Sequence, residues 1–463
     1  MAVAAVLFGR FGIHGALARD EAVYAYGGQQ LDHGVPFYAS IFDQKTPGAA
    51  YLAGLGDALG GFDGIRIAFF ACACLTVLAI YRLGLDLFGS VLAAVTGGVV
   101  FASFHGWAAD ALAGPDAKTP GILLAVLSML LVRRQRWFWA GVCGALAFLF
   151  WQPLLVYLGI ALVVSRRRAV VLGAAIPLGV TAAYFAATGA LGEFVQAAFA
   201  FPVEGLHRTP ETLAVRLGHI AAVVHAHYDA VLVWGGLALF AVLAAMRRWW
   251  VLLASLAAIA AFSVLDFQGY PDVYPLLPYA ALGIAAAVAI AGRARLVAVA
   301  GLVALVAVSW TQFAPDDALV AQEAEAASLQ RMLEPGQRLY ALGDPTPLVL
   351  TGRRNAGRYI FLGSGVGEWD QTHTRGGVIA SLRRADPAVV VLHGWRSALE
   401  RRVATWLHTE YVPRWDGDWR VFLRPDVAVR LDGARPPEGP AYRRQQVLHR
   451  ADQGGPEDHV PAV

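Results

Sequence analysis

Lysine is almost missing from this sequence: among 463 residues only Lys45 and Lys118 occur, and arginine supplies the rest of the 37 basic side chains. Charged residues of all kinds make up 15% of the chain, whereas a soluble domain carries roughly 25%. The shortage is concentrated between about residues 64 and 313, where Ala, Leu, Val, Gly and Phe runs are interrupted only by short arginine clusters. This composition excludes a single soluble globule and predicts a polytopic α-helical membrane protein.

Cysteine is also scarce, and its placement argues against a metal site. Cys72, Cys74 and Cys143 all lie inside apolar runs and lack the spacing of metal ligands. They are expected to be small buried apolar side chains. The net charge of +3 comes from arginines at the ends of predicted helices, so it gives no indication of a nucleic-acid partner.

The apolar runs predict about eleven membrane crossings. Several runs are shorter than the ~20 residues that a straight span needs, so their boundaries are soft. They lie near residues 1–14, 65–87, 90–106, 119–132, 137–150, 152–164, 170–188, 229–246, 249–265, 273–291 and 296–313.

Arginine placement predicts the orientation. Basic residues follow every second run, at Arg82, 133–136, 165–168, 247–248 and 292–295. Loops rich in arginine stay in the cytoplasm. The alternate loops, and everything after residue 313, are then expected outside a plasma membrane.

The first run is short and is interrupted by Arg10. It is either a span whose start is clipped or a signal peptide ending at "ALA". The lack of a basic segment before it favours the span.

Residues 137–164 form one long apolar stretch that a single span would carry across with its "SRRR" end outside. Two short helices that meet at Trp151–Gln152–Pro153 keep both arginine clusters inside, and Pro153 supplies the break. Broken helices need protein or water around their freed backbone groups, so we expect this tip to face an internal cavity.

Both lysines lie in the same local word, "DQKTPG" at 43–48 and "DAKTPG" at 116–121, in loops predicted to face outward. Each word predicts a helix start, with Thr46 or Thr119 as N-cap and proline at the first helical position. A helix start does not account for the matching Asp and Lys. Lysine beside a helix N-terminus favours an anion, so Lys45, and less strongly Lys118, are candidate phosphate contacts.

An acidic pair, Asp20–Glu21, follows the first run and opens "DEAVYAYGGQQLDHG". One account is an acidic start to an amphipathic helix with Val23, Tyr24 and Tyr26 along the membrane interface. The other is a general base that faces a membrane-borne substrate.

The stretch 20–56 resembles the first outer loop of GT-C superfamily glycosyltransferases, most nearly the dolichyl-phosphate-mannose–protein mannosyltransferase and aminoarabinose-transferase group. The residues that carry the resemblance are the acidic pair, Tyr24, the turn 34–36 and the word Phe42-Asp43-Gln44-Lys45-Thr46-Pro47. Asp116 in "AGPDAKTPG" resembles the acidic site of that group's second outer loop.

The resemblance implies transfer of a sugar, with mannose expected, from a polyprenyl-phosphate carrier to a hydroxyl of a protein, glycan or lipid acceptor on the outer face. In that reaction one carboxylate takes the acceptor proton and a cation stabilises the departing phosphate. Asp20 is the expected base, beside Glu21, and Lys45 is the expected phosphate contact. Asp116 is a second acidic contact, and inversion at the anomeric carbon follows from direct displacement.

The sequence departs from the family pattern at the helix break, where Trp151 replaces a frequent lysine and Gln152 brings no charge. Gln152, Asp43, Lys118 and Tyr274 are further candidate donor contacts. Some relatives bind a divalent metal near the acidic loop, so a metal stays an open expectation, although the spacing of His225, His227 and Asp229 does not favour one.

After Trp310 charged residues become frequent. A catalytic membrane module (1–314), an outer α/β domain (315–430) and a disordered tail (431–463) are therefore predicted. Within 315–430, "RLYALG", "PLVLTG" and "PAVVVLHG" predict strands, and residues 411–425 predict a hairpin. The main rival function is a lipid or sugar transporter or flippase, because broken helices also build transport cavities.

Overall fold

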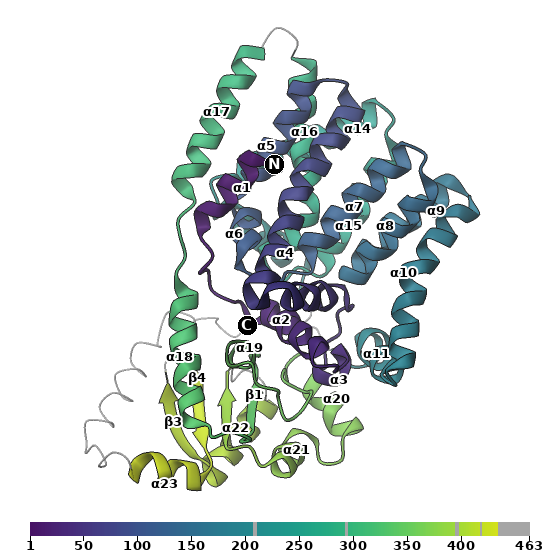
Figure 1. Cartoon of the computed structure of the whole chain (residues 1–463). Helices are drawn as coiled ribbons and strands as arrows, with labels where there is room; N and C mark the ends of the chain where they lie inside the picture. Colours follow the sequence, from purple (N-terminus) through teal and green to yellow (C-terminus); the bar gives the residue numbers. More distant parts are fainter. Residues whose placement is uncertain (207–210, 292–294, 394–397, 417–418, 434–463) are drawn as a thin grey trace.

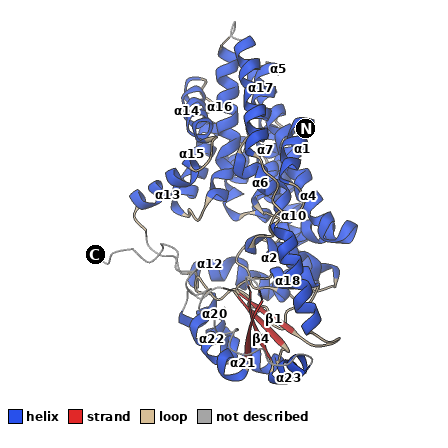
Figure 2. Cartoon of the chain, turned by 90° about the vertical axis from the view of Figure 1, so that its left-hand side faces the viewer, coloured by secondary structure: helices blue, strands red, loops and turns tan. Residues whose placement is uncertain are grey.

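The computed structural model describes residues 1–206, 211–291, 295–393, 398–416 and 419–433. A helical bundle forms one part of the molecule, and a small α/β domain lies against one end of it (Figures 1 and 2). The chain passes from the bundle to the domain once, between helix α17 (Arg295–Gln312) and helix α18 (Ala318–Met332). This transition falls where the composition changes.

Each of the eleven apolar runs falls on helix. The other helices of the first part are α1 (Ala2–Phe8), α2 (Arg19–Asp32), α3 (Phe37–Ser40), α4 (Gly48–Phe88), α5 (Val91–Ala102), α6 (His105–Ala113), α7 (Lys118–Arg133), α8 (Trp137–Phe150), α9 (Leu155–Ser165), α10 (Arg168–Ala187), α11 (Leu191–Val195), α12 (Phe201–Glu204), α13 (Leu213–His225), α14 (Ala230–Met246), α15 (Trp250–Leu265) and α16 (Leu277–Ile290). Short 3₁₀ or π turns cover Gly9–Phe11, Gln152–Leu154, Gln196–Ala200 and Tyr270–Leu276.

The predicted count of eleven crossings is not confirmed. Within the described residues, four helical segments are long and apolar enough to cross a membrane, or six if each of two bent pairs counts as one span. The other apolar helices are shorter, at 10–17 residues. Helices α8 and α9 belong to this short class because the chain breaks between them.

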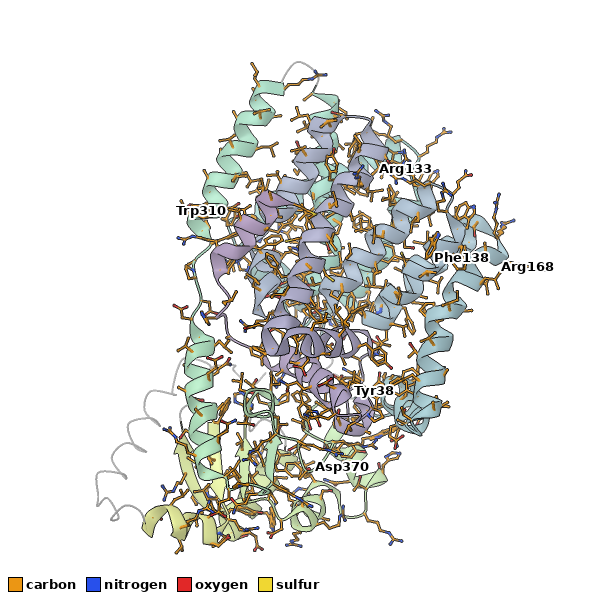
Figure 3. All side chains as sticks on the ribbon, in the orientation of Figure 1. Tyr38, Arg133, Phe138, Arg168, Trp310 and Asp370 are labelled. Carbon is orange, nitrogen blue, oxygen red and sulfur yellow. The ribbon has the colours of Figure 1, made fainter. Side chains whose placement is uncertain are left out.

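Two of the arginine-rich turns lie away from the α/β domain. Figure 3 shows Arg133 in the upper part of the bundle and Arg168 at its right-hand edge, whereas Asp370 lies below both in the domain. The loops expected outside, between α6 and α7 and between α15 and α16, therefore lie on the domain side (Figure 1).

The C-terminal domain is a four-stranded mixed sheet in the order β1-β2-β4-β3. Strand β1 (Leu339–Leu342) pairs in parallel with β2 (Val389–Leu392), which pairs antiparallel with β4 (Trp419–Leu423), beside β3 (Val412–Asp416). Its helices are α18, α19 (Thr346–Thr351), α20 (Val366–His373), α21 (Gly377–Ala385), α22 (Ala398–Glu410) and α23 (Pro425–Gly433). The predicted α/β alternation and hairpin strands are confirmed. Helix α23 runs three residues into the predicted tail, and residues 434–463 lie outside the described part.

One predicted strand is wrong, because "PLVLTG" is helix α19. The Asp344 carboxylate accepts hydrogen bonds from the Thr346 N–H (2.9 Å) and its hydroxyl (2.7 Å), which fixes a helix start. Gly352 ends the helix in the left-handed conformation. These turn residues override the strand preference of Val349 and Thr351.

The predicted contact of three α2 side chains with the membrane interface is wrong, because these side chains are buried in the protein. Val23, Tyr24 and Tyr26 are at most 2% exposed, and α2 is packed between α4 and α19 of the C-terminal domain (Figure 1). One continuous apolar core joins the two parts of the molecule across this helix. The structure therefore places the segment behind the acidic pair at the boundary between bundle and domain.

Candidate functional site

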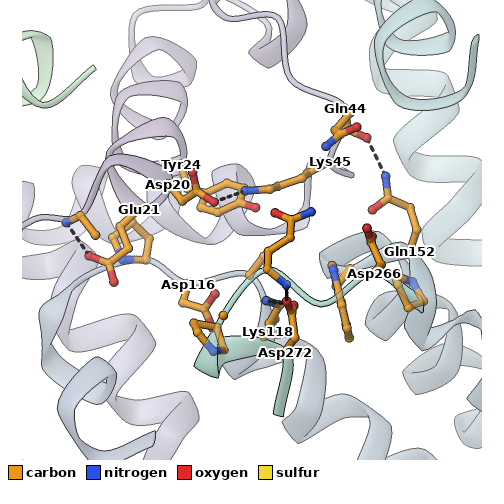
Figure 4. A pocket seen from close by; sticks show the side chains of 18 of the residues that line it. Asp20, Glu21, Tyr24, Gln44, Lys45, Asp116, Lys118, Gln152, Asp266 and Asp272 are labelled. Atoms are coloured by element: carbon orange, nitrogen blue, oxygen red, sulfur yellow. Dashed lines mark hydrogen bonds and ion pairs between the residues drawn. The ribbon is translucent and has the colours of Figure 1, made fainter. Parts of the chain in front are cut away.

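A cavity of about 810 Å³ opens at the domain end of the bundle. Its walls come from the start of α2, the loop before α4, the turn before α7, the break between α8 and α9, and the segment between α15 and α16 (Figure 4). Nine charged side chains line it: Arg19, Asp20, Glu21, Lys45, Asp110, Asp116, Lys118, Asp266 and Asp272. The cavity therefore brings together segments up to 250 residues apart, and most of the predicted site residues are on its wall.

Asp20 and Lys45 meet in this cavity as an ion pair, with Lys45 Nζ 2.9 Å from Asp20 Oδ2. Lys45 also lies over the ring of Tyr24, 5.3 Å from its centroid. Lys45 lowers the pKa of Asp20 to about 2, so this carboxylate is ionised at neutral pH. Burial alone would lower the pKa of Lys45, but the nearby Tyr24, Asp20 and Asp43 raise it well above its ordinary value.

The repeated word around each lysine is a turn that points the lysine into the cavity. Asp43 accepts a hydrogen bond from the Lys45 N–H (3.0 Å), and Asp116 accepts one from the Thr119 N–H (3.0 Å). The two motif aspartates therefore stabilise the turns. Asp43 is 9% exposed and lies off the cavity wall, whereas Asp116 lines it.

The predicted threonine N-caps are wrong in both words. Helix α4 begins at Gly48 with Pro47 as its N-cap, and α7 begins at Lys118. The Thr46 hydroxyl instead donates to the Phe148 carbonyl on α8 (3.0 Å), because the loop before α4 packs against that helix.

Lys118 pairs with Asp272 at 2.7 Å, from the segment between α15 and α16. It also lies 5.2 Å from the ring centroid of Trp151 at the helix break. Asp272 accepts a further hydrogen bond from the Gln268 N–H (2.7 Å). Each lysine of the chain is thus held by a distant carboxylate and an aromatic ring.

Glu21 lies on a different side of the cavity from the Asp20–Lys45 pair. Its Oε2 accepts a hydrogen bond from the Ala18 N–H (3.0 Å), so it acts as a cap for α2. Burial raises the pKa of Glu21 well above its ordinary value, and the charge of Asp110 raises it further. Adjacent carboxylates in the sequence therefore have opposite electrostatic environments.

Tyr274 lies behind the cavity wall. It is 1% exposed, and its hydroxyl donates to the Gly106 carbonyl (2.8 Å) and to the Asp110 carboxylate. It is placed to orient Asp110, which does line the cavity.

The predicted break between α8 and α9 is confirmed. Trp151 has an extended backbone, and Trp151, Gln152 and Pro153 line the cavity. The Gln152 side-chain amide donates to the Gln44 carbonyl at 2.6 Å. Gln152 thereby links the break to the residue before Lys45.

The described residues contain no group of three or more His, Cys, Asp or Glu arranged to hold a metal ion. His227 stacks on His105 with ring centroids 4.8 Å apart. The Asp229 carboxylate accepts a hydrogen bond from the backbone N–H of His105 at 2.8 Å. These three residues therefore contact one another.

Arg19 and Asp110 are two cavity residues that the sequence did not single out. Arg19 directly precedes the acidic pair, and Asp110 lies six positions before Asp116 in the same outer loop. A helical turn after His105 places Asp110 on the cavity side, which no local motif marks. The sequence signal for both residues was their proximity to the acidic residues already recognised, Asp20 and Asp116.

Comparison with known proteins identifies the architecture. No family model and no curated protein sequence matches the chain. The solved structure of ArnT from Cupriavidus metallidurans in the apo state is similar, with a TM-score of 0.62 and 17% identity over 91% of this chain and 96% of ArnT. The structure of the same ArnT bound to undecaprenyl phosphate gives a TM-score of 0.61 and 16% identity over the same shares. The chain thus shares the fold of ArnT over nearly its full length.

Proposed function

We propose that this protein is a membrane glycosyltransferase that moves a sugar from a polyprenyl-phosphate carrier to a hydroxyl acceptor outside the cell. The observation that carries the proposal is the Asp20–Lys45 pair, 2.9 Å apart in a cavity of about 810 Å³. The similar fold of ArnT, one of whose structures holds undecaprenyl phosphate, supports a carrier of that chemistry.

In this mechanism the donor phosphate replaces Asp20 as the ion-pair partner of the Lys45 ammonium group. Asp20 is ionised in the resting pair but is a weak base there, because Lys45 holds its pKa at about 2. Once Lys45 faces the phosphate, the Asp20 carboxylate is released to accept a proton, and its basicity rises. Donor binding therefore prepares the base.

The transfer requires one base, which accepts the proton of the acceptor, and one cation, which stabilises the leaving phosphate. The acceptor O–H gives its proton to Asp20 while its oxygen forms a bond to the anomeric carbon. The bond from that carbon to the phosphate oxygen breaks, and polyprenyl phosphate leaves with the electron pair beside Lys45. Displacement from the opposite face inverts the anomeric centre.

The remaining predicted site residues take supporting parts in this proposal. Asp116 contacts the acceptor or the sugar, and Lys118 supplies a second positive charge next to Asp272. Tyr24 contacts the ammonium group of Lys45, and Gln152 fixes the loop before Lys45 through the Gln44 carbonyl. Mannose is the proposed sugar, on the resemblance of residues 20–56 to mannosyltransferases.

The proposal predicts that Asp20→Asn lowers sugar transfer by about 10²-fold or more, because a positioned base contributes 10²–10⁴-fold. Transfer is measured with radiolabelled polyprenyl-phosphate mannose, and with other sugars on the same carrier, in membranes that contain the full chain. Asp57→Asn, a substitution on α4 that lies off the cavity wall, is the matched control.

Full activity in a folded Asp20→Asn protein would exclude Asp20 as the base. Movement of the labelled carrier across the membrane without sugar transfer would instead support the flippase. The concentration of acid and lysine side chains in a cavity at one end of the bundle, rather than at its middle, favours the enzyme.

A further inference from the structure

One short segment of the C-terminal domain, Arg358–Phe361, touches both chain segments that form the Asp20–Lys45 pair. Among the described residues, no side chain of the C-terminal domain lines the cavity. The domain is therefore not placed to contact a substrate there, but it does contact the residues that hold the cavity's charges.

The first contact is with the loop that carries Lys45. The Phe42 N–H donates to the Arg358 carbonyl at 2.7 Å, three residues before Lys45. The Phe42 ring packs on Tyr359 with centroids 5.0 Å apart, and the Arg358 guanidinium lies 5.6 Å from the Phe42 centroid. Because residues 41–47 form neither helix nor strand, their position depends on such contacts.

The second contact is with the start of α2. The Arg19 guanidinium lies 5.4 Å from the ring centroid of Phe361, and its Nε is 3.9 Å from Asp20 Oδ1. Farther along α2, the Tyr26 hydroxyl accepts a hydrogen bond from the Asn355 N–H at 2.9 Å. Helix α2 is thus held along one side by the domain.

The segment is itself anchored to the sheet of the domain. The Ile360 carbonyl accepts the Gly343 N–H (2.7 Å) just after β1, and the Asn355 side chain accepts the Ala341 N–H (2.8 Å) within β1. Arg358 also donates to Gln196 Oε1 of the bundle at 3.0 Å. A segment fixed at both ends can transmit the position of the sheet to the loop and to α2.

We propose that Arg358–Phe361 is a positioning segment that sets the geometry of the Asp20–Lys45 pair from the C-terminal domain. This inference rests on the proposed function, because it assigns to the domain a part in the same transfer. The domain then acts through Phe42 and Arg19 rather than by touching the donor or the acceptor.

The test uses the full-length protein with Phe361→Ala, which removes the ring under Arg19, and Phe361→Tyr, which keeps a ring. The matched control is Trp406→Ala in the same domain, which removes the ring beneath Arg383 (5.6 Å) and touches neither the loop nor α2. We expect kcat for sugar transfer to fall about tenfold in Phe361→Ala with a smaller change in the donor KM, because small displacements of reacting groups cost up to about 10²-fold. Phe361→Tyr should restore kcat, and Trp406→Ala should match the unaltered protein.

A second readout does not require activity. Hydrogen exchange of residues 41–46 should become faster in Phe361→Ala and stay unchanged in Trp406→Ala. Equal loss of kcat in the two alanine variants, or no loss in either, would overturn the positioning part of the segment. If the unaltered protein transfers no sugar, the proposed function fails, and exchange alone decides: equal protection of the loop in both variants would refute the inference.

Discussion

At the scale of single residues, neighbouring carboxylates differ because they face different partners. Asp20 lies beside Lys45, which lowers the pKa of its carboxylate to about 2. Glu21, one residue later, is 7% exposed and faces Asp110, and burial raises the pKa of its carboxyl. The helix turns by about 100° between them, so one side chain meets a cation and the other meets an anion.

This contrast predicts a pH-dependent stability that belongs to Glu21. The folded state holds the Glu21 proton more tightly than the unfolded chain does. Protonated Glu21 therefore contributes its full stabilisation of the folded state below pH 4.5, the pKa of Glu21 in the unfolded chain. It is lost as pH rises from 4.5 through the folded pKa. Glu21→Gln keeps an oxygen for the Ala18 N–H and cannot ionise, so its Tm relative to the unaltered protein should be higher at pH 8 than at pH 5.

Thermal unfolding in detergent at both pH values measures that difference. Glu204→Gln, at an exposed position on α12, is the control and should show the same Tm gap at pH 5 and pH 8. A Glu21→Gln protein whose relative Tm falls at pH 8 would show that the folded state favours the ionised carboxylate.

At the scale of elements, the start of α4 packs directly against the break between α8 and α9. A Cβ added at Gly48 would lie 2.6 Å from the Leu149 carbonyl oxygen, so no side chain fits there. This approach also allows the Thr46 hydroxyl to reach the Phe148 carbonyl at 3.0 Å. The end of the Lys45 loop that leads into α4 is thus packed against the end of α8.

Gly48→Ala should therefore move α4 and lower the free energy of unfolding by about 1–3 kcal/mol, the range for overpacking. Gly159→Ala on α9 is the control, because a Cβ there meets nothing within 4 Å and alanine favours helix. Chemical or thermal unfolding of the two variants gives the comparison. Equal stability of Gly48→Ala and Gly159→Ala would mean that α4 can shift at no cost.

Elements were predictable from sequence where one strong local signal decided them. Pro153 and the flanking arginine clusters predicted the break between α8 and α9, and short apolar runs predicted the strands β1 and β2. Helix α19 was missed because its start depends on Asp344 and its end on Gly352, and both outweigh a short apolar run that resembles a strand. The burial of Tyr26 was missed because its hydrogen-bond partner, Asn355, lies 329 positions away.

At the scale of the whole molecule, the cavity forms because the ends of several helices and the loops between them meet at the domain end of the bundle. The words around Lys45 and Lys118 could be recognised from sequence, and the structure places Lys45 2.9 Å from Asp20. Asp110 had only its proximity to Asp116 as a signal, and the contact of Arg19 with Phe361 could not be predicted because it requires the path of a distant segment. Motifs predict which residues converge, and tertiary packing decides which others join them.

The same arrangement predicts the orientation of the molecule in the membrane. The turns that contain Arg133 and Arg168 lie away from the C-terminal domain (Figure 3), and arginine-rich loops stay in the cytoplasm. Cysteine introduced at Ser364, exposed in the domain, should react in intact cells with a membrane-impermeant thiol reagent. Cysteine at Arg247, exposed between α14 and α15, should react only after permeabilisation, with Arg248 keeping that turn basic.

The native Cys72, Cys74 and Cys143 provide the background of this measurement, because all three lie within apolar helices and none is fully exposed. Labelling of the unaltered protein should be low on both sides. The reverse pattern, with position 247 labelled in intact cells and position 364 protected, would turn the cavity toward the cytoplasm. A carrier-linked donor outside the cell would then have no access to Asp20 and Lys45, so this labelling experiment tests the orientation on which the proposed transfer depends.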